Sequence, residues 1–139
     1  MIALLEGRAA HGATCRAGDA DVAALQVLHQ RLQQCAAEGR ITDYYAANHA
    51  IHEAFITLAD NRWLAQAIGD LRKILRLARL QQLHAPGRLQ QSLAEHLAVF
   101  DALKRRDSEA AEAAMRTHLL HQREALRDVA RNQQSRLNP

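Results

Sequence analysis

The sequence predicts an all-α fold, an antiparallel bundle of about six helices. Alanine, leucine, glutamine and arginine dominate the 139 residues, and all four are strong helix formers. Apolar residues recur at the three- and four-residue spacing of amphipathic helices, without the alternation that is typical of strands. Short connections between the helical stretches favour antiparallel neighbours, as in a bundle. With 48% hydrophobic residues, the chain can bury a single core.

Six helices are expected, each bounded by a capping or helix-breaking residue. They cover about residues 2–16, 19–37, 43–59, 61–83, 88–105 and 108–131. Residues 1–131 are expected to form one domain. The polar residues 132–139 are expected to form a frayed, disordered tail.

Local signals place the first boundaries. Gly18 and Gly39 end the first two helices, because glycine readily adopts the conformation that terminates a helix. Asp19 or Asp21 caps the second helix, and Thr42 is expected to cap the third.

The later boundaries follow from similar signals. Asp60-Asn61 ends the third helix and caps the fourth. The stretch His84-Ala-Pro-Gly87 is the strongest loop signal in the chain. Asp107 or Ser108 caps the sixth helix, whose first turns are acidic, as the helix dipole favours.

Composition and charge narrow the class of protein. The net charge is +3, but no dense Lys/Arg block occurs and aromatic residues, at 4%, are too few for base stacking. Cys15 and Cys35 do not make a disulfide framework, which favours a reducing compartment. The first residues lack the features of a signal peptide, and no apolar run is long enough to cross a membrane. A soluble, cytoplasmic protein is therefore expected.

Three histidines lie at the centre of apolar helix faces. Residues three, four and seven positions apart share a face of a helix. By this rule His52, His96 and His118 each lie among apolar or small residues, so three different helices direct an imidazole toward the core. Asn48 lies one turn before His52, and the two side chains can therefore converge on one point.

Two interpretations of these histidines stay open from spacing alone. An unpaired buried polar group costs about 1–3 kcal/mol, so each buried imidazole needs hydrogen-bond partners. A single buried histidine is most often a core residue whose ring nitrogens are hydrogen-bonded within the protein. Three together, with Asn48 beside them, can instead be satisfied by a shared divalent metal ion, because imidazole suits zinc, nickel and copper.

The other histidines are assigned less specific positions. His11, His29 and His84 are expected on the surface or in loops. His49 and His121 are expected at the edges of the histidine-bearing faces, where they are either exposed or line a pocket.

Four stretches together resemble a known family. They are Asn48-x-x-Ile51-His52, Ala59-Asp60-Asn61-x-x-Leu64, Glu95-His96-x-x-Val99-x-x-Ala102-Leu103 and Asp107-x-x-x-Ala111-x-x-x-Met115-x-x-His118-Leu119. This pattern is similar to that of the FCD domain, the FadR C-terminal domain that binds ligands in GntR-type transcription regulators. The resemblance covers roughly residues 3–127, and the six-helix form resembles the shorter, VanR-like subgroup.

The resemblance implies a helical bundle that binds a divalent metal ion and a small effector, often an organic acid. In the family the metal is held by an aspartate or asparagine and three histidines, which correspond here to Asn48, His52, His96 and His118. Zinc or nickel is the expected ion, and a homodimer is the implied assembly. Because Asn48 is a neutral amide, it is expected to bind metal more weakly than a carboxylate.

The resemblance also implies how the domain would act on DNA. Family regulators read DNA through an N-terminal winged helix-turn-helix, and no such domain precedes Met1 in this sequence. DNA binding is therefore expected only through such a domain and not through these 139 residues.

An arginine stripe is a candidate anchor for the acid. Arg72, Arg76 and Arg79 recur at helical spacing, and arginine pairs bidentately with carboxylates. Arg79 is the arginine expected to bind the effector, and His121 and His49 are further candidates for the effector site. A solvated face or a dimer contact is the alternative for this stripe.

Two other functions compete with a sensor domain. A metal-dependent hydrolase would use a metal-bound water and need a general base nearby. Glu53 and Glu95 are adjacent to motif histidines, but each points about 100° away from its neighbour, and no HExxH motif occurs. The remaining alternative is a structural or interaction bundle with satisfied core histidines. The prediction is a sensor domain that is not an enzyme.

Overall fold

The computed structural model describes residues 1–138, which form six helices with no strand among them. The helices are α1 Ile2–Arg16, α2 Asp19–Ala37, α3 Ile41–Leu58, α4 Arg62–Gln82, α5 Arg88–Lys104 and α6 Ser108–Leu137. The predicted all-α bundle is confirmed. Within the described residues no helix is long and apolar enough to span a membrane.

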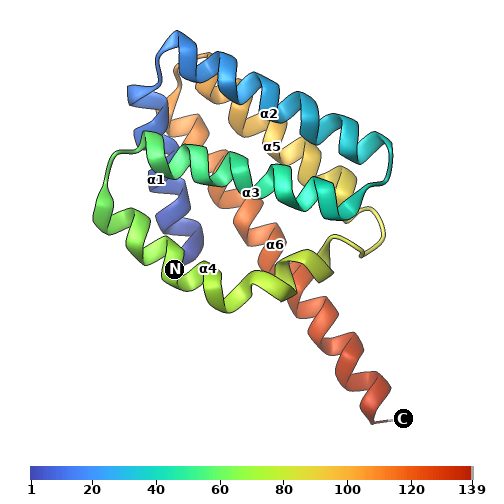
Figure 1. Cartoon of the computed structure of the whole chain (residues 1–139). Coiled ribbons are helices and arrows are strands. Elements are labelled where there is room, and N and C mark those ends of the chain that lie inside the picture. The colour runs from blue at the N-terminus through green and yellow to red at the C-terminus, as the bar shows by residue number, and fades with distance from the viewer. Residues whose placement is uncertain (139) are drawn as a thin grey trace.

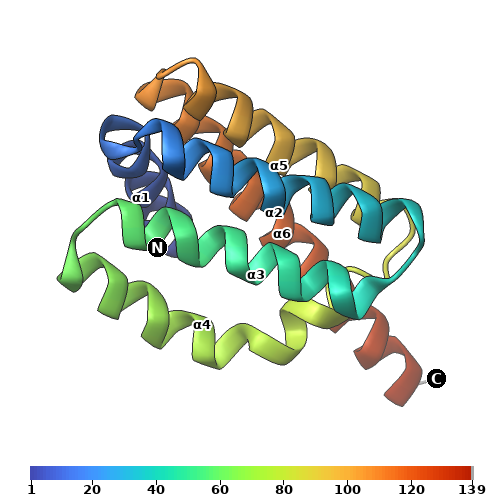
Figure 2. The same ribbon diagram turned by 45° about the horizontal axis from the view of Figure 1, so that its top comes forward.

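The helices form a bundle (Figure 1), in which α2 lies between α3 and α5 (Figure 2). α1 and α6 pack along each other, and α6 also packs against α5. α4 lies on the outer side of α3 and contacts α1, α3 and α6. As a result, the inward faces of α1, α3, α5 and α6 surround one central region.

Cap hydrogen bonds are present at three of the six helix starts, those of α2, α4 and α6. The Asn61 side chain accepts a hydrogen bond from the Leu64 amide (3.1 Å), and Asp107 accepts one from the Ala110 amide (3.0 Å). These predicted caps are confirmed, and each contributes about 1 kcal/mol. Gly18 itself is the N-cap of α2, and its amide donates to the Asp21 carboxylate at 2.8 Å.

Two helix boundaries differ from the prediction. α3 starts at Ile41 with Arg40 as its N-cap, so Thr42 lies inside the first turn. Arg40 bridges Glu38 (2.6 Å) and Asp43 (2.9 Å), which brings the chain into the helix earlier. α6 continues to Leu137, beyond the end predicted near Arg131.

The last turns of α6 leave the body of the bundle (Figure 1). Residues 131–138 are exposed on every side, so packing contributes little to them and the helix continues on the propensity of its own residues. Of the predicted tail 132–139, residue 139 lies outside the described residues.

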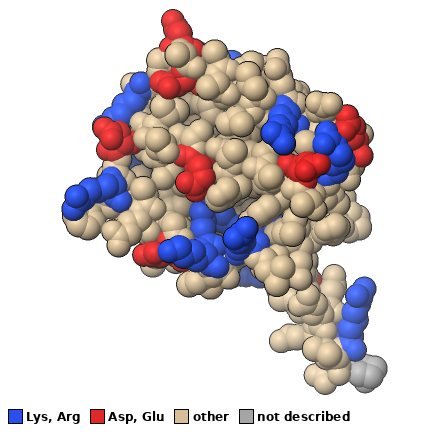
Figure 3. Space-filling view, viewed as in Figure 1, with Lys and Arg blue, Asp and Glu red and all other residues tan. Residues whose placement is uncertain are grey.

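Basic side chains gather over α4 (Figure 3). The helix carries four arginines and one lysine against one aspartate, in the order Arg62, Asp70, Arg72, Lys73, Arg76 and Arg79. Two of these arginines turn inward: Arg72 is 8% exposed and Arg79 is 6% exposed, whereas Arg76 is exposed. The arginine stripe is therefore only partly a solvated face.

Candidate metal centre and adjoining cavity

The three predicted histidines meet in the centre of the bundle. α3 supplies His52, α5 supplies His96 and α6 supplies His118, and each is at most 2% exposed. One ring nitrogen from each lies within 4.8 Å of the others. The ring centroids are 5.0 Å apart for His52 and His96, 5.4 Å for His52 and His118, and 4.4 Å for His96 and His118.

Asn48 joins this cluster. It lies one turn before His52 on α3, and it is 9% exposed. Nε2 of His96 donates a hydrogen bond to Oδ1 of Asn48. The four residues that the sequence places on inward faces are therefore brought together by three helices.

Glu6 of α1 orients one of the imidazoles. Its carboxylate is 2% exposed and accepts a hydrogen bond from Nδ1 of His52 at 2.6 Å. It also accepts from Nε of Arg72 at 2.8 Å. A carboxylate on one imidazole nitrogen fixes the tautomer and leaves the other nitrogen with its lone pair, which is the arrangement around metal-ligating histidines.

Glu95 of α5 does the same for His118. Its Oε2 accepts from Nδ1 of His118 at 2.5 Å, and its Oε1 accepts from Nδ1 of His121 at 2.7 Å. Arg88 donates to the same carboxylate at 3.2 Å. Two of the three clustered histidines therefore carry a carboxylate on Nδ1.

Burial keeps the histidines neutral. It lowers the pKa of His52 to about 3, and it also lowers the pKa values of His96 and His118. Burial alone would raise the pKa of Glu6, but His52, Arg72 and Arg79 together lower it below its ordinary value. The region therefore combines ionised carboxylates with neutral imidazoles, the protonation states that metal ligation requires.

One observation fits this cluster to a metal ion directly. Nε2 of His118 is buried and has no hydrogen-bond partner among the described residues, although Nδ1 of the same ring is bonded. A buried nitrogen with a free lone pair costs about 1–3 kcal/mol unless something binds it. Three imidazole nitrogens and one amide oxygen match the donors that zinc and similar divalent ions take.

The surroundings of the cluster carry excess positive charge. Among the described residues three arginines are buried, Arg72, Arg79 and Arg88. The side chains of Glu6 and Glu95, which are 2% and 10% exposed, oppose them. Arg72 also pairs with the half-exposed Glu53 at 3.1 Å, so it is only the buried side chains that carry one more cation than anions, and a divalent ion would add positive charge.

Arg79 is the least satisfied of these cations. Its Nε and Nη2 are buried and form no hydrogen bond with a described residue, and Nη2 lies 3.6 Å from Oε1 of Glu6. Burial lowers the pKa of Arg79, and Glu6 only partly opposes this shift. Arg79 also lines a cavity of about 340 Å³ between α1, α4 and α6.

The other predicted effector residues are placed differently. The side chain of His121 is 40% exposed and is held to the cluster through Glu95. His49 is exposed on α3, and its side chain is not among the inward-facing groups of that helix. Thus Arg79 and His121 connect to the histidine cluster through one carboxylate each, and His49 does not.

The expectation that His29 lies on the surface is wrong. His29 is 1% exposed, and its ring stacks on Phe100 with centroids 4.3 Å apart. Nδ1 bonds to the Leu25 carbonyl at 2.7 Å, and the ring centroid is 6.5 Å from that of His96. His29 lies on the same face of α2 as the buried Leu25 and Leu32. This helical spacing could have predicted its burial, but polar residues surround His29 in the sequence.

Sequence reasoning also missed Glu6 and underrated Glu95. Glu6 lies on the same face of α1 as the buried Ala9, Ala10 and Ala13, so a carboxylate within an apolar stripe was the signal. Glu95 was judged only against its neighbour His96, whereas its partners His118 and His121 come from another helix.

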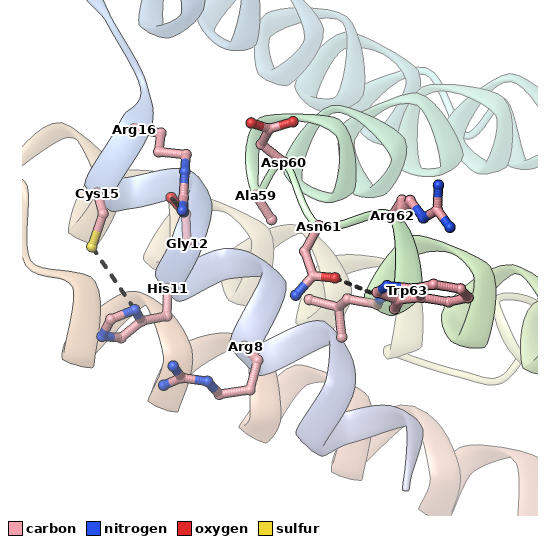
Figure 4. A pocket seen from close by; sticks show the side chains of 11 residues that line it. Arg8, His11, Gly12, Cys15, Arg16, Ala59, Asp60, Asn61, Arg62 and Trp63 are labelled. Carbon is pink, nitrogen blue, oxygen red and sulfur yellow. Dashed lines mark hydrogen bonds between the residues drawn. The ribbon is translucent and has the colours of Figure 1, made fainter.

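A larger, open cleft of about 830 Å³ lies elsewhere, between α1 and the turn from α3 to α4 (Figure 4). None of the predicted site residues lines it among the described residues. Its arginines are partly engaged: Arg8 binds Glu112 at 2.9 Å, and Arg62 stacks over Trp63 at 4.3 Å. The buried histidine cluster is therefore the stronger candidate site.

Comparison with known proteins agrees with this architecture. The model of the FCD domain matches residues 1–121, which include all six helices in whole or in part and each of the clustered histidines. No curated protein matches the chain significantly. The chain is a six-helix bundle with a central histidine cluster, and this family model matches most of its length. It therefore belongs to the FCD family of ligand-binding domains from GntR-type regulators.

Proposed function

We propose that the chain is an effector-sensing domain that binds a divalent metal ion through Asn48, His52, His96 and His118, together with a small organic acid. The family supports an effector-binding, regulatory role. The observation that carries the metal proposal is the buried histidine triad, in which Glu6 and Glu95 orient two of the imidazoles. Zinc or nickel suits a set of three imidazoles and one amide.

The charges favour an anionic effector. The bound ion would supply a Lewis acid that attracts a carboxylate. The chain itself supplies the excess of buried arginine, and Arg79 has two nitrogens free of hydrogen bonds to described residues. His121, tied to Glu95 and half-exposed, lies where it can respond to a ligand near the cluster. His49 is exposed on α3 and lines neither cavity, so nothing in the described part of the chain supports a role for it in binding the acid.

The acid would regulate DNA binding by binding one conformation of the domain more tightly than another. A ligand shifts a conformational equilibrium only by its difference in affinity between the two states. The acid would act on the packing of α1, α4 and α6, or on the arrangement of two subunits in a homodimer. DNA binding would then change through a winged helix-turn-helix attached to this domain in a cytoplasmic regulator.

No observation favours the hydrolase. Glu95 is held by His118, His121 and Arg88, so its carboxylate is already committed. Glu53 is 50% exposed and paired with Arg72. Neither is placed as a free base for water.

Organic acids should stabilise the metal-loaded protein. A ligand at one hundred times its Kd adds about 2.7 kcal/mol to stability. Thermal-shift measurements with mono-, di- and tricarboxylic acids should therefore find one class that raises the Tm of the metal-loaded wild type. The same class should have no such effect on His118→Ala. If no acid stabilises the metal-loaded protein, the effector class is wrong.

Asn48→Asp should strengthen metal binding. A carboxylate is a better ligand for a divalent cation than an amide, so the affinity should rise on the order of tenfold or more, about 1.4 kcal/mol. Competition with a chromogenic chelator measures this change. Asn61→Asp is the matched control, because it adds the same charge at the exposed N-cap of α4. Equal affinities for both variants and the wild type would exclude Asn48 as a ligand.

A further inference from the structure

The cavity beside Arg79 has the size of a small-molecule site. Its volume of about 340 Å³ falls at the lower end of the range of about 300–1,000 Å³ that ligand pockets occupy. The start of α1, the second half of α4 and the middle of α6 enclose it. Its lining includes Ile2, Leu75, Arg79, Leu119, Gln122 and Leu126.

The lining of the cavity combines buried polar, aliphatic and exposed basic side chains. Arg79 and Gln122 are the buried polar residues of its lining, 6% and 5% exposed. Arg123 and Arg127 are its exposed basic residues. The aliphatic part of the lining is supplied by Ile2, Leu75, Leu119 and Leu126.

The guanidinium of Arg79 can bind a further anion. Nε and Nη2 of Arg79 are buried without a hydrogen bond to a described residue. Its nearest carboxylate, Glu6, is 3.6 Å away and already accepts hydrogen bonds from Arg72 and His52. A buried cation that lacks hydrogen bonds is costly, and a carboxylate would satisfy it in a bidentate pair.

We propose that this cavity binds a monocarboxylic acid with an apolar chain, its carboxylate on Arg79 and its chain along Leu75, Leu119 and Leu126. The inference deepens the proposed function and rests on it in one respect, since it names the class of acid that the domain senses. At roughly 30 Å³ for a group the size of a water molecule, about eleven heavy atoms fill 340 Å³. The acid therefore has up to about nine carbons.

Titration of the metal-loaded full chain with butanoate, hexanoate, octanoate and dodecanoate tests the proposal. The affinity should rise about fourfold for each added methylene. It should stop rising beyond about nine carbons, where the chain leaves the cavity. Hexanamide, which has the chain but no charge, should bind at least tenfold more weakly than hexanoate.

Matched variants separate the two parts of the site. Arg79→Met should weaken every acid at least tenfold, and Arg76→Met, on the exposed face of the same helix, should not. Leu126→Trp narrows the apolar part of the cavity and leaves Arg79 unchanged, so it should weaken octanoate much more than butanoate. If circular dichroism shows that Arg79→Met does not fold, Leu126→Trp and the amide decide the question.

The outcomes distinguish this inference from the proposed function. An affinity that is independent of chain length and unchanged in Leu126→Trp overturns the cavity, even where a short acid still binds and supports the metal-dependent sensor. A chain-length series that persists in metal-free His118→Ala supports the cavity and refutes the dependence of the effector on metal.

Discussion

Replacing Glu6 by glutamine should lower the free energy of unfolding by about 3–5 kcal/mol, because breaking a buried ion pair leaves its partner charges uncompensated. Glu6 is 2% exposed, and it is the carboxylate that Arg72, Arg79 and His52 share. Arg72 keeps its contact with Glu53, but Arg79 loses its nearest carboxylate. Urea denaturation should show a lower midpoint with an unchanged slope.

Glu112→Gln is the control for this variant. Glu112 also pairs with an arginine, Arg8 at 2.9 Å, but the side chains are 20% and 60% exposed. Exposed pairs contribute about 0–1 kcal/mol, so this variant should unfold nearly as the wild type does. Equal losses in the two variants would mean that Glu6 does not neutralise the buried arginines.

Removing the metal ion should lower the free energy of unfolding by the second-largest amount, after Glu6→Gln. A ligand present at a thousand times its Kd adds about 4 kcal/mol to the folded state. The Tm of the wild type should therefore fall after chelation and recover on addition of zinc or nickel. His118→Ala should show neither response, because the variant lacks the ring whose Nε2 has no partner among the described residues.

A surface histidine provides the matched comparison. His84 is exposed in the turn before α5, so His84→Ala should keep the full response to chelator and metal. A His118→Ala protein that is stabilised by metal as strongly as the wild type would place the ion elsewhere.

Helix periodicity predicted the architecture and the inward-facing histidines. His52, His96 and His118 are at the centre of their stripes, and burying those stripes brings the three rings together. Asn48 followed from its position one turn before His52. Caps at Asn61 and Asp107 were also predictable, since each depends only on local geometry.

The supporting residues were not predictable in the same way. Glu6 finds His52, Arg72 and Arg79 on two other helices, so its role depends on how α1 packs. Glu95 likewise reaches across to α6. The spacing of residues along one helix predicts which side chains face the core. It does not predict which other helix packs against that face.

Metal content of the purified protein tests the proposed centre most directly. Wild type loaded with zinc or nickel and passed through a desalting column should retain about one metal ion per chain, as the single set of four donors implies. Folded His96→Ala and His118→Ala should retain almost none, while His49→Ala and His84→Ala should match the wild type. Equal metal content in all five proteins would contradict a metal centre at Asn48, His52, His96 and His118.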